Sequence, residues 1–379
     1  MTTTISGAVT RIRLWGEARD WRGYDPYDGL NSPFARLLPT RIGRRLLTQA
    51  VKLSPLNLRP LLRIAPDWNP KAIALVASAY ARLGEREHAA RWLDHLVQHR
   101  ATADDSAPAW GYNFPVETRF FAYPRNAPNT IATSFAAQAL LDGCELLGEE
   151  RWGDAAHAAA RWLESRMLSQ RAGRAFFRYV PGEEEVIHNA NMLACAVLAR
   201  AARVLGDAPL LEPAREALAT TLRAQRKDGS WPYAEGRRAW ADNFHTGYVL
   251  ESLVPFPEAR AQLELGLRYW ERAFFLPDGT PKYFPDRLYP VDAHCYAQAV
   301  ETWLAVGRFE AAERSAHVLI EQMLDPAGYV HFQRRRFWTS RVPLIRWSTA
   351  PAFRALAGVL RARAELDAHT EERAHSRLD

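Results

Sequence analysis

The sequence predicts an all-α fold: an (α/α)6 toroid, in which six helical hairpins close into a ring as a single domain. Three observations support this prediction. Asp-Gly turns recur with a period of about fifty residues, as in Asp228-Gly229 and Asp278-Gly279. Charged amphipathic segments alternate with segments that are apolar nearly all round, and glycines follow several of the apolar segments. Helical hairpins of this length bury their faces only against neighbouring hairpins, so a repeat of them builds a stacked or closed array.

The charged segments are expected to form the outer helices, because their apolar residues follow helical spacing on one face. They cover residues 42–53, 86–100, 150–168, 210–225, 257–275 and 308–324. The apolar segments are rich in Ala and Leu, which is typical of buried inner helices. They cover residues 70–84, 129–147, 189–205, 243–253, 292–306 and 349–360. Gly84, Gly148, Gly206 and Gly307 stand at or just past four of their ends, where a helix C-cap needs a positive φ.

The expected organisation has three parts. Residues 1–40 form an irregular N-terminal segment packed on the ring, because residues 21–33 are rich in turn-forming types. Residues 41–363 form the toroid, with residues 42–53 as its first outer helix. Residues 364–379 form a charged tail that frays.

Composition restricts the function classes. Of 379 residues, 48% are hydrophobic and 13 are Trp, which is enough for a large core. No uninterrupted apolar stretch is long enough for a membrane span, and the N-terminus lacks the apolar core of a secretion signal. The sparse count of 3 Cys indicates a reducing compartment, so we expect a cytoplasmic protein. The net charge of +6 favours an anionic ligand or surface, but no nucleic-acid-binding module is present.

The starts of the inner helices indicate where chemistry would take place. In a ring of hairpins, the outer-to-inner connections lie at one end, so six positive helix N-termini face one mouth and favour an anion there. The predicted catalytic residues are His245 and His294, which lie 49 residues apart at nearly equivalent positions, with Asp242 and Asp292 shortly before them. A histidine pair can transfer protons near neutral pH. The alternative is that both aspartates cap helices and both histidines are hydrogen-bonded core residues.

Other polar and aromatic residues near the helix starts are predicted to bind the substrate. They are Trp110, Tyr112, Arg119, Asn129, His188, Asn189, Asn191, Trp231, Tyr233, Asn243, Tyr283, Arg346 and Trp347. Aromatic rings can stack on sugar rings, and arginine can clamp a carboxylate or phosphate. The alternative for each class is structural: asparagine as a helix cap, aromatic side chains as core, and arginine as a solvated loop cation.

Neither a metal ion nor another cofactor is predicted. Asp292, His294 and Cys295 carry donor atoms that zinc accepts, but no second cluster has matching spacing. Asp25, Asp28 and Asn31 could bind calcium through their oxygens, yet a plain turn explains them as well.

Five strings near the expected helix starts carry a family resemblance. They are Tyr24-Asp-Pro-Tyr-Asp-Gly-Leu-Asn-Ser, Trp110-Gly-Tyr-Asn-Phe, Pro128-Asn-Thr-Ile-Ala-Thr, Asp242-Asn-Phe-His-Thr-Gly and Asp292-Ala-His294. Together they resemble bacterial polysaccharide-biosynthesis proteins of the Vps J type, over roughly residues 20–360. The resemblance implies a six-hairpin toroid that works beside glycosyltransferases in exopolysaccharide or capsule production. The toroid also resembles N-acylglucosamine 2-epimerases, glucuronyl C5-epimerases, unsaturated-uronide hydrolases and alginate-type lyases, although no 2-epimerase motif matches residue by residue.

The predicted function is that of a carbohydrate-active enzyme of bacterial surface-polysaccharide biosynthesis. It acts on a sugar or uronic acid by acid/base chemistry of the epimerase, hydrolase or lyase type, and its partners include other biosynthesis enzymes. One alternative is a terpene cyclase or prenyltransferase, because residues 225–231 resemble a QW repeat. The absence of an Asp-rich diphosphate site argues against it. The other alternative is a non-catalytic scaffold that binds glycans.

Overall fold

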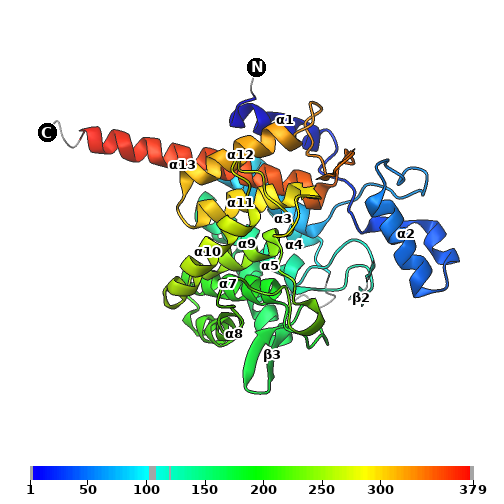
Figure 1. Ribbon diagram of the computed structural model, residues 1–379. Coiled ribbons are helices and arrows are strands. Elements are labelled where there is room, and N and C mark those ends of the chain that lie inside the picture. Colours follow the sequence, from blue (N-terminus) through cyan, green and yellow to red (C-terminus); the bar gives the residue numbers. More distant parts are fainter. Residues whose placement is uncertain (1–2, 102–107, 119–120, 376–379) are drawn as a thin grey trace.

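The computed structural model describes residues 3–101, 108–118 and 121–375. Helices dominate this part of the chain, and the strands are short (Figure 1). The predicted all-α toroid is confirmed, because the helices form an inner and an outer layer around one axis. No helix of the described residues combines the length and the apolarity that crossing a membrane requires.

Six helices form the inner layer of the described structure. They are α3 (Pro70–Arg82), α5 (Thr130–Leu147), α7 (His188–Val204), α9 (Asn243–Leu253), α11 (Ala293–Ala305) and α13 (Ala350–His375). Each packs against the next one along the chain, and α13 returns to α3, so the layer is closed. Their central parts are buried on nearly every side, as the apolar sequence pattern predicts.

Six helices of the described residues form the outer layer. They are α1 (Ile5–Glu17), α4 (Arg86–Gln98), α6 (Gly153–Trp162), α8 (Leu211–Arg223), α10 (Arg260–Phe274) and α12 (Phe309–Met323). The prediction that residues 42–53 supply the first outer helix is wrong, because α1 packs on α13 and α12 and takes that place. The signal was present in the sequence, since Ile5, Val9 and Ile12 follow helical spacing and are buried.

Helix α2 (Arg41–Leu53) stands outside the two layers (Figure 1). It packs against the short helix η1 (Asp28–Asn31) and strand β1 (Val116–Glu117). Residues 1–40 are also less irregular than predicted, because α1 and η1 lie within them. At the other end, α13 continues as a helix to His375, so residues 364–375 extend the last inner helix instead of forming an irregular tail.

The remaining elements lie mainly in connections. The strands are β2 (Ala122–Tyr123), β3 (Leu168–Arg171), β4 (Arg174–Phe177), β5 (Val291–Asp292), β6 (Gln333–Arg334) and β7 (Thr339–Ser340). They pair antiparallel as β1-β2, β3-β4 and β5-β6-β7. The short helices are η2 (Pro33–Leu37), η3 (Glu150–Trp152), η4 (Leu163–Met167), η5 (Ala208–Leu210), η6 (Gly236–Arg238), η7 (Pro257–Ala259) and η8 (Ile345–Thr349). All strands lie in connections from an outer to an inner helix, so they gather at the end where the inner helices begin, which we call the N-terminal mouth.

An ion-paired triad joins the last inner helices to the first. Arg82 of α3 binds both carboxylate oxygens of Glu301 on α11, at 2.9 and 3.0 Å. Arg354 of α13 binds the same carboxylate at 2.9 Å. Trp21, fully buried after α1, stacks on Phe353 of α13 at 5.0 Å. These contacts close the ring through both ion pairs and apolar packing.

Candidate functional site

Four inner helices begin at a side-chain cap. The caps are Asn69, Asn129, Asp242 and Asp292, each of which accepts a hydrogen bond from a backbone N–H two or three residues later. Such caps satisfy N–H groups that the helix itself leaves unpaired. Asp242 and Asp292 therefore cap helices, as the structural alternative states. The placement of the two histidine side chains is a separate question.

The two predicted catalytic histidines stand at different positions relative to their caps. His294 is the second residue after Asp292, whereas His245 is the third after Asp242. One residue turns an α-helix by about 100°, so the two side chains leave their helices in different directions. The expectation of nearly equivalent positions is wrong for this reason. His294 is 2% exposed and lies in the interior, whereas the His245 side chain keeps 23% exposure.

His245 and Asp242 form a dyad at the N-terminal mouth. The imidazole Nδ1 lies 2.7 Å from Oδ2 and 3.0 Å from Oδ1 of Asp242. Because an ionised carboxylate only accepts, Nδ1 carries the proton and Nε2 is left as an acceptor. No described residue bonds to this Nε2. The rings of Phe244 and Tyr233 flank the imidazole at 3.9 and 4.6 Å. This arrangement orients one nitrogen of His245 and leaves the other for a ligand.

His294 belongs to a hydrogen-bonded chain in the interior. Its Nδ1 lies 2.8 Å from the backbone carbonyl of Trp347, which can only accept, so Nδ1 donates. Its Nε2 then accepts from the hydroxyl of Tyr248 at 2.7 Å. The Tyr248 oxygen in turn accepts from Nζ of Lys71 at 3.0 Å. Burial, followed by the nearby Lys71, lowers the pKa of His294 well below its usual range, so this imidazole stays neutral.

The sequence interpretation missed Lys71, whose side chain lies at the centre of the ring. It extends from α3 to Tyr248 on α9, the opposite inner helix, and its ammonium lies 4.2 Å from the centre of the Phe135 ring. Burial lowers its pKa well below the usual value for lysine. A usable signal existed, because Lys71 is the second residue after the cap Asn69 and His294 is the second after Asp292. That position faces the ring axis.

Asp292 is buried among donors. It accepts the His294 backbone N–H at 2.8 Å, Nε1 of Trp347 at 2.9 Å and Nε2 of Gln333 at 2.6 Å. Burial raises its pKa from 3.8 to about 6, and these hydrogen bonds offset part of the increase. Asp292 therefore holds His294 and Trp347 in place through these hydrogen bonds.

Replacing Asp292 with asparagine should change how stability depends on pH. A carboxyl group whose pKa is raised by folding stabilises the native state most at pH values below its pKa in the unfolded chain. This stabilisation is lost as the pH rises through its pKa in the folded protein. Relative to the wild type, Asp292→Asn should therefore gain stability between pH 3.8 and about 6, by at most ~3 kcal/mol. Urea unfolding at several pH values measures the difference. A difference that stays constant across this range would contradict the assignment.

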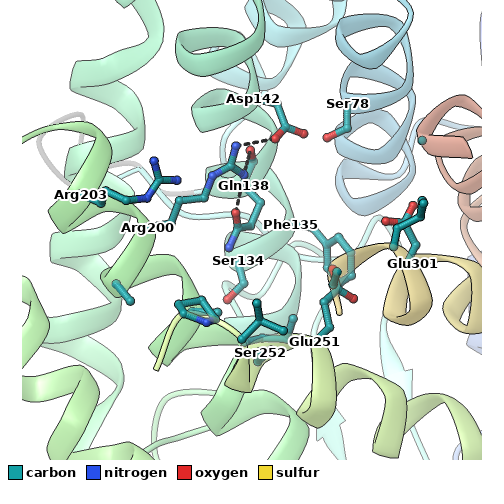
Figure 2. A pocket seen from close by; sticks show the side chains of 18 of the residues that line it. Ser78, Ser134, Phe135, Gln138, Asp142, Arg200, Arg203, Glu251, Ser252 and Glu301 are labelled. Atoms are coloured by element: carbon teal, nitrogen blue, oxygen red, sulfur yellow. Dashed lines mark hydrogen bonds and ion pairs between the residues drawn. The ribbon is translucent and has the colours of Figure 1, made fainter. Parts of the chain in front are cut away.

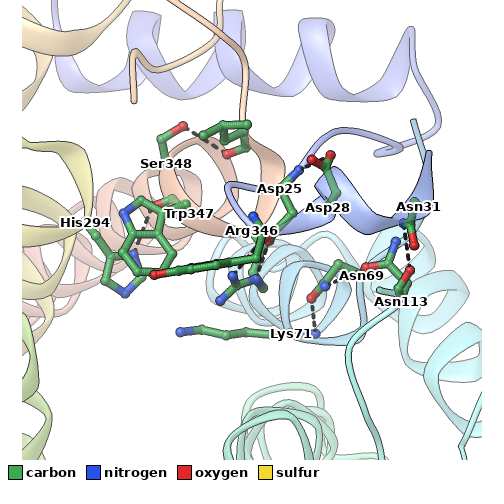
Figure 3. A network of polar contacts seen from close by, with 12 residues as sticks. Asp25, Asp28, Asn31, Asn69, Lys71, Asn113, His294, Arg346, Trp347 and Ser348 are labelled. Carbon is green, nitrogen blue, oxygen red and sulfur yellow. Dashed lines mark hydrogen bonds and ion pairs between the residues drawn. The ribbon is translucent and has the colours of Figure 1, made fainter. Parts of the chain in front are cut away.

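Arg346 does not have the free charge that an anion clamp requires. Its Nε and Nη2 bind the two oxygens of Asp25 at 2.5 and 2.9 Å, and both side chains are buried (Figure 3). Its guanidinium lies 4.7 Å from the centre of the Tyr112 ring. The prediction that Arg346 holds a ligand anion is corrected on this ground. The pair instead fastens the N-terminal segment across the mouth, and Figure 3 places it beside Trp347 and His294.

Tyrosines from successive connections surround the mouth. Tyr27, Tyr123, Tyr179, Tyr233 and Tyr283 are all partly buried. Tyr233 stacks on Trp240 at 5.2 Å with an interplanar angle of 7°. Burial raises the pKa of Tyr179 and Tyr283 well above the usual phenol value, so these hydroxyls remain protonated. The mouth thus combines aromatic faces with hydroxyl donors.

Several predicted binding residues are structural in their placement. Trp110 and Trp231 are buried, and their indole N–H groups donate to the carbonyls of Leu96 and Thr221. Asn129 is a cap, Asn191 bonds to Phe177, Ala217 and Thr221, and Asn243 bonds to Lys282 and Trp270. In these five residues the polar groups are already satisfied inside the protein, as the structural alternative expects. Arg119 lies outside the described residues.

Two predicted residues keep buried polar atoms without a partner among the described residues. They are His188, through Nε2, and Asn189, through Oδ1. Burial lowers the pKa of His188 to about 4, so it is neutral at physiological pH. Unpaired buried polar atoms are rare in proteins and usually meet water or a ligand.

A cavity of about 860 Å³ opens at the opposite end of the ring (Figure 2). Phe135 and Tyr248 line it, and charged residues surround it. Arg200 binds Asp142 at 2.6 Å, and Arg82 and Arg354 belong to the ring-closing triad. These arginines are already paired, whereas the partly buried Glu251 accepts a hydrogen bond from Gln298 at 2.8 Å and has no ion-pair partner among the described residues. No described histidine lines the cavity. The predicted catalytic residues His245 and Asp242 lie instead at the N-terminal mouth. Tyr248 touches both regions.

Among the described residues, no group of three or more His, Cys, Asp or Glu side chains is arranged to hold a metal ion. The two aspartates considered for calcium have other partners. Asp25 binds Arg346, and Asp28 binds Arg59 at 2.8 Å.

Comparison with known proteins gives matches by fold. No family model and no curated protein matches the sequence. The cellobiose 2-epimerase of Bacillus thermoamylovorans B4167 aligns over 77% of this chain and 88% of its own, with 12% identity and a TM-score of 0.60. A GH76 α-mannanase of Bacteroides thetaiotaomicron aligns over 81% and 90%, with 12% identity and a TM-score of 0.59. An unsaturated glucuronyl hydrolase specific for heparin aligns over 80% and 88%, with 14% identity and a TM-score of 0.55. At these identities, the likeness establishes the toroid and nothing finer.

Proposed function

We propose that the protein is a carbohydrate-active enzyme that performs acid/base chemistry on a sugar or uronic acid at the N-terminal mouth. The observation that carries the proposal is the His245–Asp242 dyad. Asp242 holds Nδ1 of His245, and Nε2 points to a partly exposed, aromatic surrounding with no protein partner among the described residues. A histidine oriented in this way can act as a general base or acid.

The surroundings of the dyad suit a sugar. Tyr233, Trp240 and Tyr283 present aromatic faces, against which the C–H face of a sugar ring can pack. The tyrosine hydroxyls and the unpaired Asn189 oxygen supply hydrogen-bond partners for sugar hydroxyls. The inner-helix N-termini favour a carboxylate group on the ligand.

The biological setting proposed here is bacterial surface-polysaccharide biosynthesis in the cytoplasm, beside other enzymes of that process. The resemblance to polysaccharide-biosynthesis proteins supports it. The fold supports action on a carbohydrate but not this setting, because the structures it resembles are described as a cellobiose epimerase, a mannanase and a glucuronyl hydrolase. The three cysteines are free thiols, which suits a reducing compartment.

Ligand-dependent thermal unfolding tests the proposal. A ligand that binds only the native state increases the free energy of unfolding by RT ln(1 + [L]/Kd), and therefore raises the melting temperature. Glucuronic acid, galacturonic acid and nucleotide-linked uronates should raise it, and the increase should fall in His245→Ala. Stabilisation by prenyl diphosphates alone would favour the terpene-cyclase alternative. Binding of a saccharide that no assay shows to be converted would favour the glycan-binding scaffold.

A further inference from the structure

Exposed apolar side chains gather in one segment of the chain. Seven large apolar residues between positions 33 and 63 are at least 42% exposed: Phe34, Leu37, Ile42, Leu46, Leu53, Leu56 and Leu61. We call these seven residues the α2 patch. The exposed large apolar residues elsewhere in the described chain are scattered, for example Leu14 and Leu366. A concentration of this kind on a folded protein marks an interaction surface.

Helix α2 presents its two faces differently. Thr48 and Val51 are buried on the side that packs against η1. Ile42, Leu46 and Leu53 follow a spacing of four and seven residues, which places them together on the opposite, exposed face. The helix therefore buries only Thr48 and Val51 and leaves three large apolar side chains exposed, whereas an ordinary surface helix buries its large apolar residues.

The same segment carries the positive charge of the protein. Residues 33–63 contain no Asp or Glu, and their basic residues are Arg36, Arg41, Arg44, Arg45, Lys52, Arg59 and Arg63. The whole chain has a net charge of +6, so the rest of it is slightly acidic. Arg59 is neutralised by Asp28, and Arg41 and Arg44 share Glu117. Even after these pairs are subtracted, the segment remains strongly cationic.

We propose that the α2 patch docks the protein on the surface of an anionic phospholipid bilayer. The apolar side chains enter the boundary between headgroups and acyl chains, and the flanking arginines contact lipid phosphates. Amphipathic helices with an exposed apolar face and basic flanks bind membranes in this way. A second copy of the chain is disfavoured as the occupant, because it would bring two cationic segments together.

Docking through α2 would orient the ring. Nζ of Lys52 on α2 lies 2.8 Å from the hydroxyl of Tyr27, whose ring lies 6.0 Å from that of Trp347 at the N-terminal mouth. The mouth would thus be held close to the headgroups, an arrangement that suits a saccharide carried on a lipid. This consequence rests on the proposed function, whereas membrane binding itself does not.

Vesicle flotation tests the proposal with the whole 379-residue chain. Vesicles of phosphatidylcholine with phosphatidylglycerol should carry the protein, and vesicles of phosphatidylcholine alone should carry much less. Raising the salt from about 0.1 to about 1 M should weaken binding, because the Debye length falls from about 10 to about 3 Å. The double variant Ile42→Ser/Leu46→Ser should bind at least about tenfold more weakly, since two inserted side chains are lost. Arg36→Gln/Arg63→Gln should lose about fivefold per charge.

The matched control is Leu14→Ser/Leu366→Ser, which alters two apolar residues of similar exposure away from α2. It should bind vesicles like the wild type. Circular dichroism and melting temperature check that every variant is folded. Failure of the wild type to bind anionic vesicles, or equal binding by Ile42→Ser/Leu46→Ser, overturns the proposal. So does a dimer in analytical ultracentrifugation that only the α2 variant loses, because a second copy would then cover the patch. Sugar binding is measured separately, so either proposal can fail alone.

Discussion

Replacing His245 with alanine should lower the specific activity of the folded protein by about 10²–10⁴-fold, which is the usual contribution of a general acid or base. The variant should remain folded, because the side chain is partly exposed and its one hydrogen-bonding partner among the described residues is the helix cap Asp242. Asp242→Asn should also lower activity, since an amide no longer fixes the tautomer of His245. Until a substrate is identified, the measurement is polysaccharide production in complemented cells, with protein level checked.

The chain offers a matched control for this experiment. His157 and Asp207 form a similar pair, with Nε2 of the imidazole 2.6 Å from the carboxylate, on the outer surface of the ring. His157→Ala removes a histidine of the same kind far from the mouth and should leave activity unchanged. Equal loss in both variants, or normal activity in folded His245→Ala, would rule out the proposed role of His245.

Replacing Asp25 with alanine should lower the free energy of unfolding by about 3–5 kcal/mol, because it leaves the Arg346 charge buried without its partner. Asp25 is 3% exposed and Arg346 is 5% exposed, so water cannot replace the carboxylate without local opening. Chemical denaturation measures the effect. The N-terminal segment should also become more accessible to protease, since this pair fastens it to the start of α13.

Two further variants make this prediction specific. Glu258→Ala breaks an exposed ion pair with Arg215 and should cost about 0–1 kcal/mol, because surface pairs contribute little. Asp25→Leu/Arg346→Met removes both buried charges and should recover much of the loss, as replacing a buried ion pair by apolar residues often does. If Asp25→Ala unfolds at the same denaturant concentration as the wild type, the pair does not hold the segment.

Much of the fold could be predicted because its signals are local in sequence. The spacing of Asp228-Gly229 and Asp278-Gly279 and the alternation of helix types establish a ring of hairpins. The first outer helix was misplaced because two amphipathic segments compete for that position. Both α1 and α2 have an apolar face, and only packing shows that α1 buries it while α2 exposes it.

The sequence by itself determined the architecture, and it offered Asp242 and Asp292 as caps of two inner helices. Tertiary structure alone decided which residues meet. Lys71 bonds to Tyr248 across 177 positions, and Asp25 bonds to Arg346 across 321. The separation of His245 from His294 depends on a single residue of register after the cap, which rotates a side chain by about 100°. Periodicity read along the chain specifies a helix and its turn, but the direction of one side chain depends on how the helix is rotated against its neighbours.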